Sequence, residues 1–145
     1  MPAAGETIIA GKVPGERIAT TIATATSAGV TTTETTIDSV TAALVNGRTY
    51  RIRWVTQATS TVASDRADVR IRLTSPAGSQ LQSRSLNITS TTAGADGTIE
   101  AEYTAASTGN QVFAGTVVRG SGTGTITCPA ATNRPRYLYV DYISG

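Results

Sequence analysis

Histidine is absent from this chain of 145 residues, and cysteine occurs only once, as Cys128. Nucleophilic triads normally use histidine as their base, and zinc and copper sites use it as their commonest ligand. A single cysteine can form neither an internal disulfide nor a multi-cysteine metal site, and free cysteines are usually buried. We therefore predict a protein that is not an enzyme, with no catalytic or metal-binding residues and no cofactor.

Long hydrophobic runs and helical periodicity are also missing. No stretch approaches the roughly 18 apolar residues of a membrane-spanning helix. Residues 1–6 lack the basic and apolar regions of a signal peptide, so we expect a chain made in the cytoplasm that makes no membrane contact. No segment repeats its apolar residues every 3.6 positions, which predicts almost no helix.

Positive charge is scarce and dispersed. The net charge is +2, and Lys12 is the only lysine. Binding to nucleic acid depends on clustered lysine and arginine, so we expect no nucleic-acid partner. Arginine suits fixed, bidentate pairing with carboxylates, which favours ordered surface ion pairs and protein contacts.

The clearest positive signal is a strand pattern around the only tryptophan. Tyr50, Ile52 and Trp54 alternate with Arg51 and Arg53, so the aromatic and apolar side chains share one side of an extended strand. A side chain as large as that of Trp54 dominates the burial around it. We expect this strand at the centre of a β-sandwich, with its arginines on the outer face.

Several similar strands follow at short spacing, joined by turns, and the threonine-rich composition suits strands. The sequence predicts an all-β, antiparallel β-sandwich or jelly-roll-like domain over residues 17–145, with an extended N-terminal arm over residues 1–16. The length suits one domain with one core. Asn46-Gly47 predicts a type I′ hairpin that pairs the segment ending at Leu44 with the tryptophan strand.

Outward-facing charges of opposite sign occur at the same spacing in three strands. These are Arg51 and Arg53, Arg70 and Arg72, and Glu100 and Glu102. Like charges placed opposite each other on neighbouring strands would repel. We therefore predict that the glutamate strand lies beside at least one arginine strand, forming a cross-strand ladder that sets register more than stability.

Two groups of residues are candidates for protein contacts. Ile8, Ile9 and Val13 lie in the arm, which either packs along its own domain or docks on a neighbour. Tyr137 and Tyr139 follow Pro135 in the last strand pattern and point to the side opposite its apolar residues. Tyrosines on an outer face either form an interface or cover the edge of the sandwich.

The glycine-rich stretch 120–124 superficially resembles a phosphate-binding loop. It lacks the Gly-Lys-Ser/Thr ending, and no helix follows it, so the geometry that cradles an anion is not predicted. We interpret it as a flexible link. The close pair Glu100 and Glu102 is interpreted as a solvated face paired with arginine rather than as an acid–base site.

Two stretches carry a family resemblance. Residues 48–54, followed by residues 69–72, resemble small all-β virion proteins of tailed phages that infect actinobacteria. Residues 119–124 and 135–145 are similar to the close of many head and tail accessory proteins there, although Ser144 interrupts the usual Ile-Gly ending. The resemblance is one of pattern and brings no catalytic residue with it.

The resemblance implies a structural part of the virion, most specifically a capsid decoration protein that binds the outer shell of the head. Its partners would be the major capsid protein or other virion proteins. A homo-oligomer is expected, with a trimer favoured by analogy with lattice threefolds. The alternatives are a minor tail or fibre protein that meets the host surface, and a carbohydrate-binding module that uses Tyr137 and Tyr139.

Overall fold

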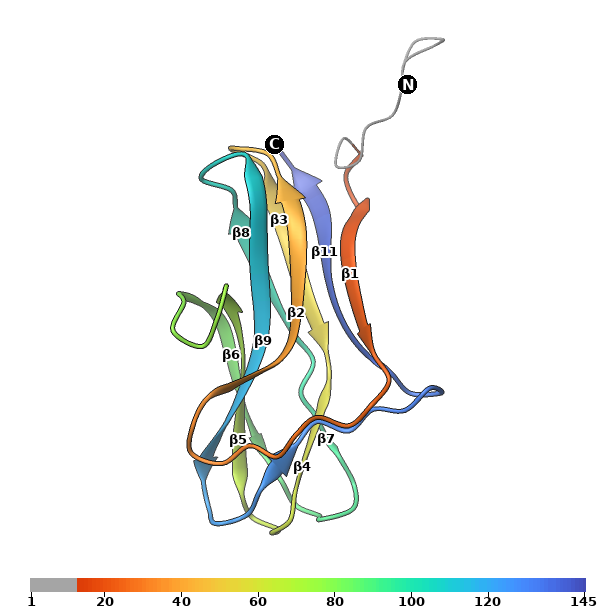
Figure 1. Cartoon of the computed structure of the whole chain (residues 1–145), viewed down its shortest axis with the longest axis vertical. Coiled ribbons are helices and arrows are strands. Elements are labelled where there is room, and N and C mark those ends of the chain that lie inside the picture. The colour runs from red at the N-terminus through yellow and green to blue at the C-terminus, as the bar shows by residue number, and fades with distance from the viewer. Residues whose placement is uncertain (1–12) are drawn as a thin grey trace.

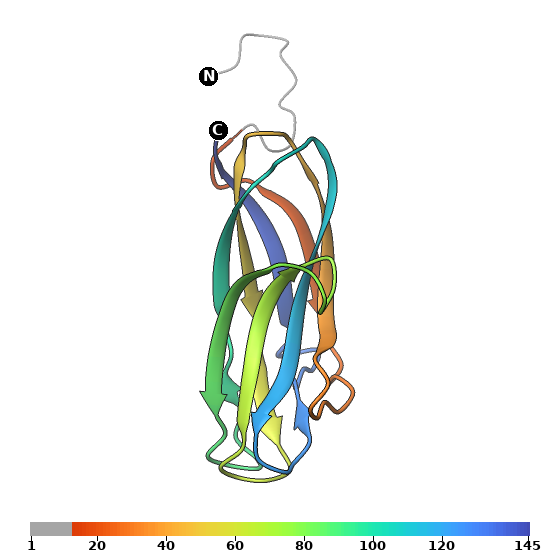
Figure 2. The same ribbon diagram turned by 90° about the vertical axis from the view of Figure 1, so that its left-hand side faces the viewer.

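Two four-stranded antiparallel sheets pack face to face in the computed structural model, which describes residues 13–145 (Figure 1). The first sheet has the strand order β1 (Arg17–Ala23), β11 (Arg136–Ser144), β3 (Thr49–Val55) and β8 (Ile99–Thr104). The second sheet, seen in front in Figure 2, has the order β2 (Thr35–Leu44), β9 (Gly109–Ser121), β5 (Arg66–Leu73) and β6 (Gln80–Asn87). Three short strands form a small third sheet near the lower end in Figure 1: β10 (Ile126–Thr127), β4 (Gln57–Ser60) and β7 (Ala95–Asp96).

The eight longer strands pair in a nested order. β1 pairs with β11, β2 with β9, β3 with β8 and β5 with β6, and successive pairs alternate between the two sheets. This is the arrangement of a jelly roll, so the predicted all-β, jelly-roll-like sandwich is confirmed. Residues 13–145 contain no helix, and therefore no helix in that range could cross a membrane.

The tryptophan strand lies in the interior of the first sheet, as predicted. β3 is hydrogen-bonded to β11 on one side and to β8 on the other. Tyr50, Ile52 and Trp54 are buried, because the period-two alternation of β3 turns them all toward the second sheet. Gly115 on β9 faces the indole, and a Cβ there would come within 2.6 Å of the ring. The absence of a side chain at Gly115 is what lets the two sheets close over Trp54.

The predicted hairpin at Asn46-Gly47 is wrong, although the turn itself is present. The Arg48 amide donates to the Val45 carbonyl oxygen, and Gly47 has a φ of 81°. However, β2 pairs with β9 in the second sheet, whereas β3 pairs within the first sheet. The turn therefore carries the chain from one sheet to the other. Each strand pairs within its own sheet and buries its apolar face in the core between the two sheets.

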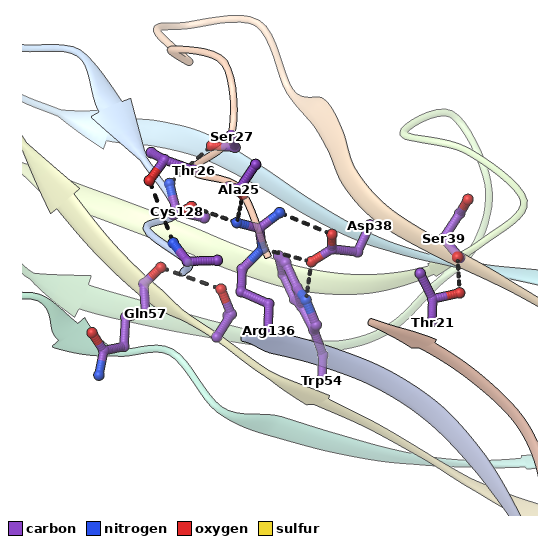
Figure 3. A network of polar contacts seen from close by, with 12 residues as sticks. Thr21, Ala25, Thr26, Ser27, Asp38, Ser39, Trp54, Gln57, Cys128 and Arg136 are labelled. Carbon is purple, nitrogen blue, oxygen red and sulfur yellow. Dashed lines mark hydrogen bonds and ion pairs between the residues drawn. The ribbon is translucent and has the colours of Figure 1, made fainter. Parts of the chain in front are cut away.

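A buried ion pair joins the two sheets at the end of Trp54 (Figure 3). Asp38 comes from β2, whereas Trp54 and Arg136 come from β3 and β11. Asp38 Oδ2 accepts hydrogen bonds from Trp54 Nε1 at 2.8 Å and from Arg136 Nε at 2.9 Å, and Asp38 Oδ1 accepts one from Arg136 Nη2 at 3.0 Å. Arg136 Nη1 donates to the carbonyl oxygens of Ala25 and Cys128. This cluster, here called the Asp38 network, thus ties both sheets and two connecting segments together.

The glycine-rich stretch 120–124 binds a carboxylate of the protein itself, that of Asp65. The Asp65 carboxylate is buried and accepts hydrogen bonds from the Ser60 hydroxyl at 2.6 Å and from the backbone N–H groups of Thr123 and Gly124 at 3.2 and 2.9 Å. Gly122 has a φ of 97°, and a Cβ there would lie 1.8 Å from Asp65 Oδ1. The interpretation of this stretch as a flexible link is therefore wrong, because its amides converge on one carboxylate.

The Asp38→Asn variant should be strongly destabilised, because it leaves the Arg136 guanidinium buried without its counter-charge. We expect a loss of about 3–5 kcal/mol in the free energy of unfolding, measured by chemical denaturation at neutral pH. Glu100→Gln is the matched control: it also removes a carboxylate next to an arginine, but at the exposed surface, where the loss should stay below about 1 kcal/mol. Equal, small losses for the two variants would contradict this role of the Asp38 network.

The Asp65→Asn variant should change how stability depends on pH. The hydrogen bond from Ser60 lowers the pKa of Asp65; burial opposes this, but the amides of Thr123 and Gly124 and the charge of Arg119 lower the pKa further. A carboxyl with a folded pKa below its unfolded value of about 4 adds stability above that pH, and this stability is lost as the pH falls through the folded pKa.

Unfolding free energies measured from pH 7 to pH 2 should therefore separate the wild type from Asp65→Asn near neutrality, and the two curves should converge in acid. Ser60→Ala should reduce the separation in the same sense, because it removes the strongest hydrogen bond to the carboxylate. Curves that stay parallel down to pH 2 would show that the charge of Asp65 does not contribute to stability.

Candidate interaction surface

The side of the first sheet that faces away from the core, here called the outer face, presents its side chains in three rows that run across the strands. The strand register defines each row, since residues directly opposite each other in a sheet point to the same side. The charged row is Arg17, Asp141, Arg51 and Glu102; the middle row is Thr20, Tyr139, Arg53 and Glu100; and the apolar row is Ile22, Tyr137 and Val55.

The charged row and the middle row contain the predicted cross-strand ladder. The register places Glu102 opposite Arg51 and Glu100 opposite Arg53. Arg51 Nε lies 3.2 Å from Glu100 Oε1, on the diagonal between the two rows. Both side chains of that pair are more than 40% exposed, so the pair contributes to register and little to stability.

Arg17 fastens the edge strand β1 to this face. Its Nε donates to Asp141 Oδ1 at 2.9 Å, and its guanidinium carbon lies 3.5 Å from the centroid of the Tyr139 ring. The hydrogen bond to Asp141 raises the pKa of the Arg17 guanidinium. The tyrosine ring is thus partly covered by a cation, a geometry that stabilises an arginine over an aromatic face.

The apolar row is the exposed hydrophobic part of the outer face. Ile22 is 58% exposed and lies directly opposite Tyr137, which is half-buried, with Val55 on the next strand. A shallow pocket of about 110 Å³ adjoins this row, with Val55, Gln57 and Asp96 in its wall. Tyrosine is enriched at protein interfaces, so this row is the apolar part of the candidate surface.

The arm residues are only partly placed. Ile8 and Ile9 lie outside the described residues, and Val13 is 51% exposed. The Gly15 amide donates to the Tyr142 carbonyl oxygen at 2.7 Å, and the Tyr142 amide donates to the carbonyl oxygen of the next residue, Glu16. The end of the predicted arm, residues 15 and 16, is therefore bound to the end of β11 and packs along its own domain.

Arg70 and Arg72 do not join the ladder with Glu100 and Glu102, because β5 belongs to the second sheet. Both bind Glu34 instead: Arg70 Nη1 and Arg72 Nε each lie 2.6 Å from one of its carboxylate oxygens. Burial by itself would raise the pKa of Glu34, but hydrogen bonds from Arg72 and Thr116 and the charge of Arg70 lower it overall. Glu34 thereby binds the segment before β2 to the outer side of the second sheet.

Sequence reasoning missed Asp38, Arg136, Glu34 and Asp65 as residues with partners. Cys128 is buried as expected, and burial raises the pKa of its thiol to about 11, which keeps it in the unreactive thiol form. Within residues 13–145, no three carboxylate or cysteine side chains gather in a way that could hold a metal ion. In the sequence, Asp38 is marked only by its position two residues before the inward-facing Val40, and Arg136 by its position two residues before the inward-facing Leu138. This spacing places each charged residue on the buried side of its strand.

Comparisons with known proteins add little to this description. No family model matches the chain, and no curated protein matches it. Among solved structures, one described as "CBM4 structure and function" is 18% identical, and the alignment covers 75% of this chain and 69% of that chain. The TM-score of 0.36 is too low for this likeness to support any argument about function.

Proposed function

We propose that this protein is a structural component of a virion, most specifically a capsid decoration protein that binds the outer shell of a phage head. The observation that carries the proposal is the division of roles among its side chains. Charged side chains such as Asp38, Glu34 and Asp65 have partners in the same chain and stabilise the fold, while Ile22 and Tyr137 are presented on the outer face of the first sheet. Such a molecule acts by shape and contact.

The fold is compatible with this role but does not by itself define it. Jelly rolls form viral capsid domains and also lectin domains, and function depends on the site rather than on the fold. The proposal therefore also rests on the resemblance of residues 48–54 and 135–145 to virion accessory proteins. A minor tail or fibre protein would use the same outer face against the host surface.

Location and copy number in purified particles test the virion role directly. A decoration protein should be present in hundreds of copies on the head, whereas a tail or fibre protein should be present in a few copies on the tail. Quantitative mass spectrometry of particles, together with labelling in electron microscopy, would measure both. Absence from purified particles would overturn the proposal.

Deleting residues 1–12 should abolish binding to undecorated capsids if the arm docks on a neighbouring subunit. The deletion stops before Gly15 and Glu16, whose backbone bonds to Tyr142 belong to the folded domain. Co-sedimentation with capsids would measure binding, and an unchanged thermal unfolding midpoint would show that the domain remains intact. Full binding by the truncated, folded protein would show that the arm has no part in docking.

A carbohydrate-binding module is the second candidate, and the pocket beside the apolar row is the observation that favours it. Tyr137 would offer a ring for stacking, while Gln57 and Asp96 in the pocket wall would offer polar partners. The decoration proposal predicts no glycan binding on an array. Binding that is lost in Tyr137→Ala but kept in Thr104→Ala, a change on β8 outside the pocket wall, would replace the decoration proposal by this alternative.

A further inference from the structure

The charges of the outer face alternate in sign across the sheet. From β1 to β8, the charged row reads Arg17, Asp141, Arg51 and Glu102, which is positive, negative, positive and negative. Reversing an alternating row of four exchanges every positive position for a negative one. The row is therefore complementary to itself when it is read in the opposite direction.

Two copies that meet through their outer faces can be related by a twofold axis that lies in the plane of contact and runs parallel to the strands. This axis reverses the order of the strands in one copy relative to the other. It places β1 of one copy over β8 of the other, and β11 over β3, while each row stays opposite the same row. Arg17 then faces the second copy's Glu102, and Asp141 faces the second copy's Arg51. The same operation gives both contacts twice, as an isologous interface requires.

The same operation also brings residues of the other two rows together. In the middle row, Arg53 of one copy faces Tyr139 of the second copy, and Thr20 faces Glu100. Because Arg17 of the same chain already covers the Tyr139 ring, neither contact is counted as a source of affinity.

In the apolar row, Tyr137 of one copy faces Val55 of the second copy, whereas Ile22 lies over the start of the second copy's β8, which contributes no residue to this row. One symmetry operation thus matches the charged row completely and brings Tyr137 and Val55 together in the apolar row.

Two of these charges are available for a partner. The Arg53 guanidinium and the Glu102 carboxylate are exposed and make no hydrogen bond or ion pair with any residue between 13 and 145. The pKa of Asp96 is lowered first by hydrogen bonds from Thr98, and the charge of Arg53 also acts on Asp96 and lowers its pKa. The outer face carries three arginines and three carboxylates, so it is also close to neutral as a whole. A neutral face with unpaired charges of both signs does not repel a second copy of itself.

We propose that the outer face of the first sheet is the interface of a homodimer whose twofold axis runs parallel to the strands. The charge order favours this twofold contact over the trimer that lattice analogy suggests. Twisted sheets that pack face to face align at an angle of about 30°, which the contact accommodates. The inference concerns the isolated protein and does not depend on a role in a virion.

The size of the face predicts a weak dimer. Four strands about 4.8 Å apart, each extending over at most about 30 Å, cover roughly 600 Å² per copy. This is below the roughly 800 Å² per partner of a standard interface, so a dissociation constant in the micromolar range or weaker is expected. Because the contacts are ionic and near the surface, raising the salt from about 0.05 to 0.5 M should weaken the dimer.

Charge reversal tests the geometry at the pair that joins Arg17 to Glu102. Arg17→Glu alone and Glu102→Arg alone each place like charges opposite each other twice, so each variant should dimerise at least tenfold more weakly in sedimentation equilibrium. A mixture of the two variants restores opposite charges at both contacts and should form a heterodimer. Arg84→Glu, a reversal on β6 in the second sheet, is the control and should leave dimerisation unchanged.

The outcomes separate clearly. A monomer–dimer equilibrium in the wild type, its loss in each reversal variant and its recovery in the mixture support the proposal. A wild type that stays monomeric up to millimolar concentration, a trimer, reversal variants that dimerise normally, or a mixture that stays monomeric would each overturn it. If Arg17→Glu fails to fold because it loses its bond to Asp141, Glu102→Arg decides alone, since Glu102 has no hydrogen bond within residues 13–145 to lose.

Discussion

The carboxylate of Asp38, buried between the two sheets, is the constraint on which the rest of the structure depends. A charge removed from water is tolerated only when opposite charge and hydrogen bonds replace the lost solvation. Arg136 and Trp54 supply these replacements, with Nε and Nη2 of the guanidinium on the two carboxylate oxygens. The carbonyl oxygens of Ala25 and Cys128 then satisfy Arg136 Nη1. Two sheets and two connecting segments meet at this ion pair, and moving any of them away would leave part of it without a partner.

The same principle recurs in two other connecting segments. Glu34 joins the segment before β2 to two arginines of β5, and Asp65 gathers the amides of the glycine-rich stretch. In each case a carboxylate replaces the regular backbone pairing that a loop lacks. These two carboxylates thus fix the positions of connecting segments that lie outside the two main sheets.

The outer face of the first sheet is organised differently. Its charges lie in rows, alternate in sign and leave Arg53 and Glu102 without hydrogen-bonded partners in the described part of the chain, while Ile22 and Tyr137 form an apolar end. The buried carboxylates hold the fold together, whereas this face is the surface on which the proposed dimer depends. The two features are linked, since a sheet face can present a defined pattern of side chains only when the strands that carry it are fixed.

The sequence by itself determined the class of fold and the inward and outward sides of the strands, because alternation with a period of two depends only on neighbours along the chain. It also determined that Glu100 and Glu102 need an arginine strand beside them, since like charges repel. Only the tertiary structure decided that β2 and β3 part at Asn46-Gly47, that Arg70 and Arg72 bind Glu34, and that Asp38 binds Arg136, which lies 98 positions away. These outcomes depend on which segments meet across the core, and no local pattern carries that information.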